Sequence, residues 1–125
     1  MHARAAQTYQ RVDLESAPKI QIVDRLFRRF ADDAAAARAA LAAGDVRGKA
    51  AAIDHALQIV AELTAALDPT ASPELCANLA SLYGFVQAQL GDASARRDPA
   101  ALERATCVMA ELGDAFAQVH QGGAR

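Results

Sequence analysis

Histidine and cysteine are the side chains best suited to chemistry in this 125-residue chain, and they are few and scattered. The histidines are His2, His55 and His120, and the cysteines are Cys76 and Cys107. None of them falls in a Glu-x-x-His, HExxH or CxxC pattern, and the chain has neither a GxSxG motif nor a glycine-rich phosphate loop. The sequence therefore predicts no catalytic residues, no metal site and no cofactor, and we expect a protein that is not an enzyme.

His55 is the one histidine with a conceivable catalytic role, because it lies next to the apolar stripe of a predicted helix. Phosphotransfer bundles present such a histidine, with a lysine and then small residues after it that let phosphate approach. Here Ala56-Leu57-Gln58-Ile59 follows, without a lysine. We interpret His55 as a surface residue and keep a histidine phosphotransfer domain as the less favoured alternative.

The two cysteines are predicted to be free thiols. If the last two helices form a hairpin that turns near residue 95, Cys76 lies opposite about residue 113. Cys107 is then offset by several residues at about 1.5 Å each, more than a disulfide allows. The first 16 residues lack the apolar core of a signal peptide, and no apolar run approaches the ~20 residues of a membrane span. We expect a cytoplasmic protein with reduced thiols.

The net charge of −2 argues against general binding to nucleic acid or insertion at an anionic membrane, which favour a basic face. Two short arginine runs remain, Arg25/Arg28/Arg29 and Arg96/Arg97. We interpret both as solvated helix and loop charge.

The composition predicts an all-α fold, because much of the 53% hydrophobic content is alanine and only 5% is aromatic. Capping and stop residues then divide the chain: Ser16 and Pro18, Gly44-Asp45, Ser72-Pro73, Gly91-Asp92 and Asp98-Pro99. They predict helices over 17–43, 46–67, 73–91 and 99–119. The short connections favour an antiparallel up-down four-helix bundle over residues 16–121, after an extended N-terminal arm (1–15) and before a flexible C-terminus (122–125).

Phe85 is the residue that an ordinary bundle core does not explain. The expected core stripe of the third helix comprises Leu75, Leu79, Leu82, Val86 and Leu90. At about 100° per residue Phe85 points away from this stripe, toward Asn78 and Ser81. Excess apolar surface on a soluble protein is typical of a binding site.

Two segments carry a family resemblance. Before the first helix, Tyr9-Gln10 is followed by Glu15-Ser16-Ala17-Pro18-Lys19-Ile20, and in the middle Leu67-Asp68 precedes Asn78-Leu79-Ala80-Ser81-Leu82-Tyr83, with Leu90 beyond. On these residues the chain resembles the FliS family of flagellin-specific export chaperones. It departs from the family pattern in the 69–73 loop, in the step after Gly91, and in having Phe116 where tryptophan is frequent.

The resemblance implies a function. FliS-like chaperones bind the C-terminal segment of flagellin in the cytoplasm, prevent its premature polymerisation and deliver it to the flagellar type III export apparatus. Export-gate components or a co-chaperone are further partners to consider. The alternative is a helical homodimeric interaction module that does not bind flagellin.

Under this interpretation, the second and third helices form the main walls of a groove for flagellin, and the arm covers that groove until flagellin binds. The predicted partner-binding residues are Tyr9, Val12, Leu14, Ile59, Leu63, Leu67, Leu79, Leu82, Tyr83 and Phe85.

Overall fold

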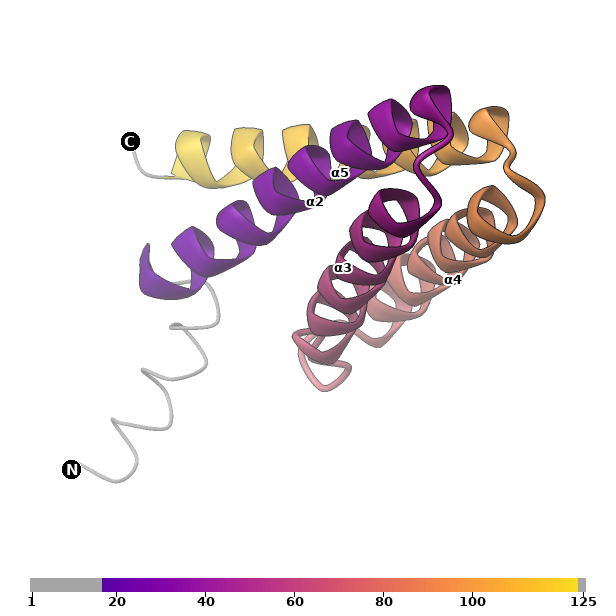
Figure 1. Cartoon of the computed structure of the whole chain (residues 1–125). Helices are drawn as coiled ribbons and strands as arrows, with labels where there is room; N and C mark the ends of the chain where they lie inside the picture. The colour runs from indigo at the N-terminus through magenta and orange to yellow at the C-terminus, as the bar shows by residue number, and fades with distance from the viewer. Residues whose placement is uncertain (1–16, 124–125) are drawn as a thin grey trace, which may run out of the picture.

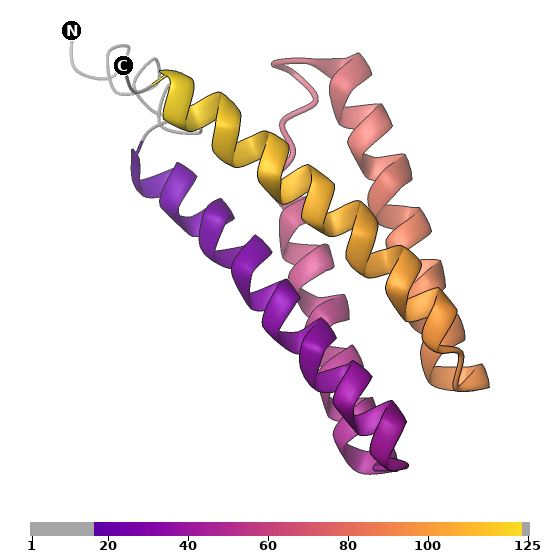
Figure 2. The same ribbon diagram turned by 90° about the horizontal axis from the view of Figure 1, so that it is seen from above.

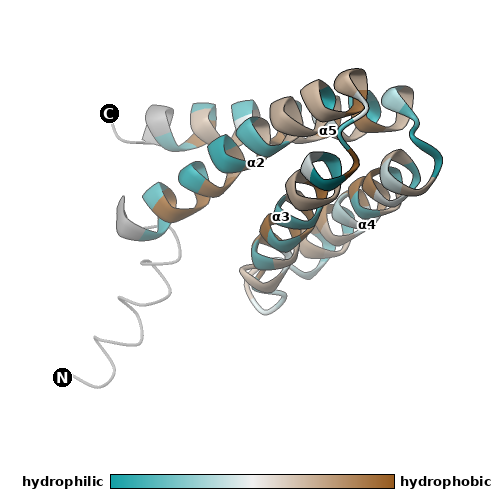
Figure 3. Ribbon diagram, in the orientation of Figure 1, coloured by the Kyte–Doolittle hydropathy of each residue, from teal (hydrophilic) through white to brown (hydrophobic). Residues whose placement is uncertain are grey.

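The computed structural model describes residues 17–123, and this part of the chain is helical without a strand. The helices are α2 (Ala17–Ala43), α3 (Val46–Ala65), α4 (Pro73–Arg96) and α5 (Pro99–Gly123). Hydrophilic and hydrophobic residues alternate along each of them, as amphipathic helices require (Figure 3). The predicted all-α four-helix bundle is confirmed.

The helices form a square in which each contacts two neighbours. The pairs in contact are α2–α3, α3–α4, α4–α5 and α5–α2, whereas the diagonal pairs do not meet within residues 17–123. Away from the turns at Gly44 and Arg97, the α2–α5 pair diverges from the α3–α4 pair (Figure 1). The start of α2 and the end of α5 lie together at the far end (Figure 2). We call the end with the two turns the closed end and the opposite end the open end.

Short polar caps make the turns of the closed end. Gly44 has a φ of 71°, which glycine adopts without steric strain. Asp45 Oδ1 then accepts a hydrogen bond from the backbone N–H of Gly48 at 2.9 Å, and Asp98 Oδ1 accepts one from Ala100 at 3.0 Å. The predicted helix starts at Asp45 and Asp98 are therefore confirmed.

The end of α4 differs from the prediction, because the helix passes Gly91 and continues to Arg96. A glycine inside a helix costs about 1 kcal/mol relative to alanine. Burial of Leu90 and Ala93 on the core side of the same turns outweighs that cost. The chain leaves the helix at Arg97, which has a left-handed φ of 51°.

The ends of α3 and α5 also differ from the predicted ends. α3 stops at Ala65 rather than at residue 67, because its last turn tightens and the N–H of Leu67 bonds the carbonyl of Thr64 at 3.1 Å. α5 continues beyond residue 119 to Gly123. In its last turns the rings of Phe116 and His120 contact each other in a tilted arrangement, with centroids 4.2 Å apart.

The core runs along the axis of the square and is built from large aliphatic side chains between alanines. Its largest fully buried side chains are Phe30, Ile53, Val60, Val86, Leu90 and Leu102. Alanines of α2, such as Ala34 and Ala37, let α3 approach closely.

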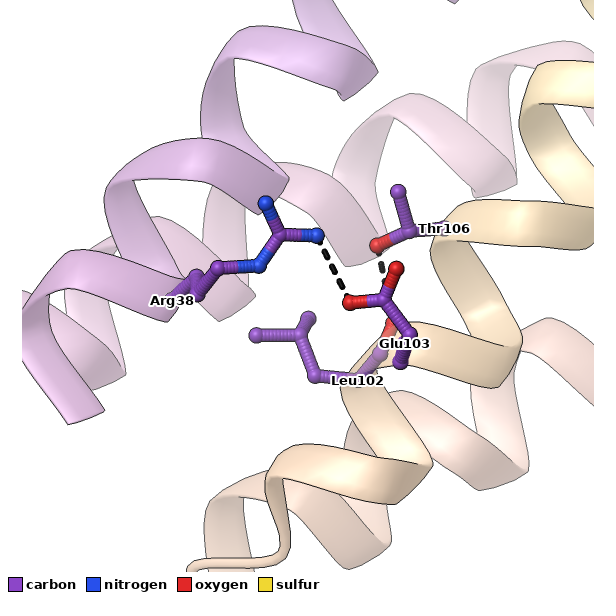
Figure 4. Close-up of polar contacts among 4 residues, drawn as sticks. All are labelled: Arg38, Leu102, Glu103 and Thr106. Carbon is purple, nitrogen blue, oxygen red and sulfur yellow. Dashed lines mark hydrogen bonds and ion pairs between the residues drawn. The ribbon is translucent and has the colours of Figure 1, made fainter. Parts of the chain in front are cut away.

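Polar contacts between helices are found near the closed end. Arg38 of α2 donates to Glu103 of α5 at 2.7 Å, next to the hydroxyl of Thr106, which bonds its own helix (Figure 4). The buried Lys49 of α3 donates from Nζ to the carbonyl of Ser94 in α4 at 2.9 Å. These bonds fix the closed end, where a cation beside the C-terminal carbonyls of α4 is also favourable.

Candidate functional site

One side of α4 is increasingly exposed from the closed end to the open end. Ala93 is fully buried, Leu82 is 39% exposed and Leu75 is 55% exposed. These residues are 11 and 18 positions apart, close to whole turns at 3.6 residues per turn, so they share one side of the helix. Gln89, on the adjoining face, accepts a hydrogen bond from Arg104 of α5 at 2.8 Å, so this is the side that α5 covers near the closed end.

The prediction that Leu75 and Leu82 belong to the core stripe is therefore wrong. α5 diverges from α4 toward the open end and leaves both leucines uncovered (Figure 1). The observed core face is rotated toward Tyr83, which is buried between Leu79 and Val86 in the helical register. Burial also raises the pKa of the Tyr83 phenol above its usual value.

Phe85 is 41% exposed, which confirms that it points away from the core. Its side chain lines a shallow hollow of about 520 Å³ between α4 and α5. We call this hollow the α4–α5 groove; its lining residues are Phe85, Ala100, Glu103, Arg104, Cys107 and Val108.

The charged residues of the α4–α5 groove already have partners within the bundle. Arg104 is bound by Gln89 and lies 3.7 Å from an oxygen of Asp98, while Glu103 is paired with Arg38 (Figure 4). Because these charges balance one another, the groove offers an apolar surface with Phe85 as its largest exposed side chain.

The predicted partner-binding residues occupy three environments. Ile59, Leu63 and Tyr83 are buried, Leu67 and Leu79 are half-buried, and Leu82 and Phe85 are exposed. Tyr9, Val12 and Leu14 lie outside the described residues. That any of these side chains contacts a partner remains a prediction.

Five of the six groove residues were absent from the predicted set, and all five belong to α5: Ala100, Glu103, Arg104, Cys107 and Val108. Helical periodicity does indicate that Val108 lies on the apolar face of its helix. It carries no information on whether α4 covers that face.

The structure brings few reactive or metal-binding side chains together. Within residues 17–123, no cluster of three or more histidine, cysteine or carboxylate side chains could hold a metal ion. Cys76 and Cys107 are free thiols, as predicted. Of the helices described, none has the length and hydropathy needed to cross a membrane.

His55 has an exposed ring on α3, with Nδ1 at 3.9 Å from Oδ1 of Asp33 on α2. Burial raises the pKa of the Asp33 carboxyl, and the neighbouring Asp32 raises it further, while His55 and Arg29 oppose the shift. The pair joins two helices at the surface.

The chain matches a known family over nearly its whole length. A family model described as "Flagellar protein FliS" matches residues 1–123. The chain belongs to the FliS family. A relative from Salmonella typhimurium (strain LT2), named flagellar secretion chaperone FliS, is 30% identical over 122 residues, covering 94% of this chain and 90% of the relative. A relative of the same name from Escherichia coli (strain K12) is 28% identical over 119 residues, covering 91% and 88%.

These matches confirm the resemblance drawn from the two sequence segments and show that the chain is a flagellar chaperone of the FliS family. The Asn78–Tyr83 segment of that resemblance lies in α4. Its Tyr83 fills the core and its Leu82 faces outward. The segment thus contributes both to the fold and to the exposed apolar side of α4.

Proposed function

We propose that this FliS-family chaperone binds the C-terminal segment of flagellin in the cytoplasm. By holding the segment it prevents premature polymerisation and delivers flagellin to the flagellar type III export apparatus. The observation that carries the proposal is the half-exposed Phe85 in the α4–α5 groove, continued by Leu82 and Leu75 along α4. The relatives' name, flagellar secretion chaperone, supports a role in secretion.

The arrangement of these side chains suits helix-in-groove recognition. Leu75 and Phe85, with Leu82 between them, are ten positions apart on α4, or about 15 Å at 1.5 Å per residue. A client helix along this line would bury apolar anchors at positions i, i+3, i+4 and i+7. Burial at about 25 cal/mol per Å² must exceed the entropy lost when a disordered client segment becomes helical.

The N-terminal arm is the second part of the proposal. Its apolar residues Tyr9, Val12 and Leu14 are tethered to the start of α2, at high effective concentration near the bundle. We propose that the arm covers exposed apolar surface in the free chaperone and repacks when flagellin binds. Such a cover reduces aggregation through bare apolar surface.

The proposed role requires no catalysis. Replacing the exposed His55 by alanine should therefore leave client binding and flagellin export unchanged. Asp54→Ala, at the neighbouring exposed position of α3, is the matched control. Uptake of phosphate at His55 from a cognate kinase would contradict this part of the proposal.

The decisive experiment is calorimetric titration of the full chain with a synthetic peptide of the flagellin C-terminal segment, with light scattering before and after. We expect a complex of one chaperone and one peptide, and a negative heat-capacity change from apolar burial. A dimer whose mass the peptide does not alter would instead support the homodimeric interaction module.

A further inference from the structure

Exposed apolar side chains lie on both α4 and α5 toward the open end. Ala101 and Val119 are eighteen residues apart on one side of α5, yet Ala101 is fully buried and Val119 is 67% exposed. Val108, on the same side, lines the α4–α5 groove, so this side faces α4. On α4, Leu82 and Leu75 are exposed as well. If α5 leaned toward α4, these side chains would bury one another, which is favourable by about 25 cal/mol per Å². A contact on another side of α5 is needed to hold it away from α4.

The register of the helices places Gly113 at the level where this exposure begins. Arg104 of α5 donates a hydrogen bond to Gln89 of α4, and in an antiparallel pair each residue further along α5 corresponds to one further back along α4. Gly113 is therefore within one turn of the level of Leu82. Its nearest neighbour on another helix is Phe27 of α2. At this level α5 contacts α2 on one side and leaves α4 uncovered on the other.

Gly113 lets α5 come close to α2 because it has no Cβ. A Cβ at this position would lie 3.3 Å from three atoms of Phe27, one of which is the Phe27 Cβ. Two carbon atoms attract best at roughly 3.5–4.0 Å, so this separation is too short. A hollow of about 330 Å³ beside the contact gives the Phe27 ring room to turn, but the Phe27 Cβ is fixed to the α2 backbone. A side chain at residue 113 therefore fits only if the two helices separate.

The rest of this side of α5 also allows close packing on α2. Ala110 and Ala117, one turn before and after Gly113, line the same hollow. Beyond them the rings of Phe27 and Phe116 have centroids 6.0 Å apart. The start of α2 and the end of α5 accordingly lie together at the open end (Figure 2).

We propose that Gly113 is a positioning residue for client binding: because it has no side chain, α5 packs against α2 and leaves the open half of α4 uncovered. This inference rests on the proposed function, since it makes the path of α5 decide how much of Leu82 and Leu75 flagellin can reach. Gly113 lines the hollow beside α2 and not the α4–α5 groove, so it acts through the position of the helix.

The test compares valine at two glycines inside helices of the full chain. Gly113→Val adds a β-branched side chain at the contact with Phe27. Gly91→Val in α4 is the matched control, because a Cβ at Gly91 would have no atom within 4 Å and the change in helix propensity is the same. Gly113→Ala, which adds the Cβ alone, should act in the same direction and more weakly. Circular dichroism should show that all three variants stay folded.

Spin labels measure the separation of α4 and α5 with no client present. Cysteines that replace Asn78 of α4 and Ala115 of α5 carry the labels, since both positions are exposed and the register places them at one level. Serines replace the free thiols Cys76 and Cys107 in this background. Double electron–electron resonance then gives the α4–α5 label distance.

A second pair of labels, at the exposed Gln21 of α2 and Gln118 of α5, gives the α2–α5 label distance. In Gly113→Val we expect the α4–α5 distance to shorten and the α2–α5 distance to lengthen, because α5 moves from α2 toward α4. Both distances should be unchanged in Gly91→Val.

Calorimetric titration with the flagellin peptide connects the path of α5 to the client. Binding should weaken about tenfold in Gly113→Val and change less than about twofold in Gly91→Val. When Phe27 is replaced by alanine in both the wild type and Gly113→Val, the loss should be smaller. The reason is that two of the three atoms nearest the added Cβ, Cγ and Cδ1 of Phe27, are then absent.

Three results would overturn the inference. Unchanged label distances in Gly113→Val would show that the glycine does not set the path of α5. A longer α2–α5 distance with an unchanged α4–α5 distance would show that α2 moves instead. A shorter α4–α5 distance with normal peptide binding would show that the path of α5 does not govern the client site. Failure of the proposed function is distinguishable, because the wild type then does not bind the peptide while the distances still change as expected.

Discussion

Ala93 and Leu75 lie on the same side of α4, eighteen residues apart, yet Ala93 is fully buried and Leu75 is 55% exposed. The same contrast occurs on α2, where Ala40 is buried and Ile22, also eighteen residues away, is 51% exposed. In both helices the buried residue is near the closed end. The divergence of the helix pairs therefore leaves exposed, toward the open end, sides of α2 and α4 that are buried near the closed end.

Phe85→Asp should weaken binding of the flagellin peptide by about tenfold or more, because Phe85 is the largest exposed side chain of the proposed site. Calorimetric titration measures this loss. The free energy of unfolding should stay within about 1 kcal/mol of the wild type, as for other surface substitutions. Val46→Asp, at an exposed apolar position of α3 outside the groove, is the control and should bind normally. If Phe85→Asp unfolds the chain, Phe85 belongs to the core.

Leucines on the two halves of α4 should differ in their contribution to stability. Leu90→Ala removes a fully buried side chain and should lower the free energy of unfolding by about 2–5 kcal/mol. Leu82→Ala, at a 39% exposed position, should lower it by about 1 kcal/mol or less. Urea denaturation measures both values. Equal losses would mean that Leu82 is covered in solution.

Asp33 should make stability depend on pH. Burial, the largest cause, raises its pKa above the usual 3.8, so the ionised carboxylate is less favourable in the folded chain than in the unfolded chain. Its contribution to stability is thus complete below about pH 3.8 and declines as the pH rises through the folded pKa. We therefore expect the free energy of unfolding of the wild type to fall, relative to that of Asp33→Asn, as the pH rises through this range.

Thermal melting of the wild type and Asp33→Asn at a series of pH values checks this expectation. When His55 is replaced by alanine in both proteins, the loss of stability relative to Asp33→Asn should be larger, because His55 opposes the rise in the pKa of Asp33. A wild type that gains stability over Asp33→Asn as the pH rises would show that attraction to His55 and Arg29 exceeds the effect of burial.

Deletion of residues 1–14 tests the proposed role of the arm. If the arm competes with flagellin for exposed apolar surface, the shortened chain should bind the flagellin peptide more tightly and be less soluble. If the arm contacts flagellin directly, binding should weaken. A full-length variant with alanine at Tyr9, Val12 and Leu14 separates the apolar side chains from the length of the segment. No change in either property would leave the arm without a role in binding.

Much of the fold follows from local signals in the sequence. Gly44-Asp45 and Asp98-Pro99 combine residues that end one helix and begin the next, and both turns occur where they are predicted. Gly91 misled the prediction, because its local preference for a helix end was weaker than the burial of Leu90 and Ala93 beside it. A tertiary contact of this kind cannot be read from a local window of sequence.

The candidate site could be predicted only in part. The helical wheel identified Phe85 as a residue outside the core stripe, and its exposure agrees. The wheel treats every turn of a helix as equally covered, so it assigned Leu82 to the core and left Tyr83 for the surface. Leu82 is exposed where α5 diverges from α4, whereas Tyr83 lies on the observed core face of α4. Both outcomes depend on how the helices cross, which no single helix encodes.

The buried bond from Lys49 to the carbonyl of Ser94 has a consequence for the motions of the bundle. It joins α3 to the last turn of α4 at the closed end, whereas ring contacts such as Phe27–Phe116, with centroids 6.0 Å apart, lie toward the open end. Local unfolding should start toward the open end, where the helices cover one another least. Amide hydrogens at the open end should then exchange with deuterium through small fluctuations, and those around Lys49 only through global unfolding. A chaperone with this arrangement can unfold locally at its open end to admit a client while the rest of the bundle stays folded.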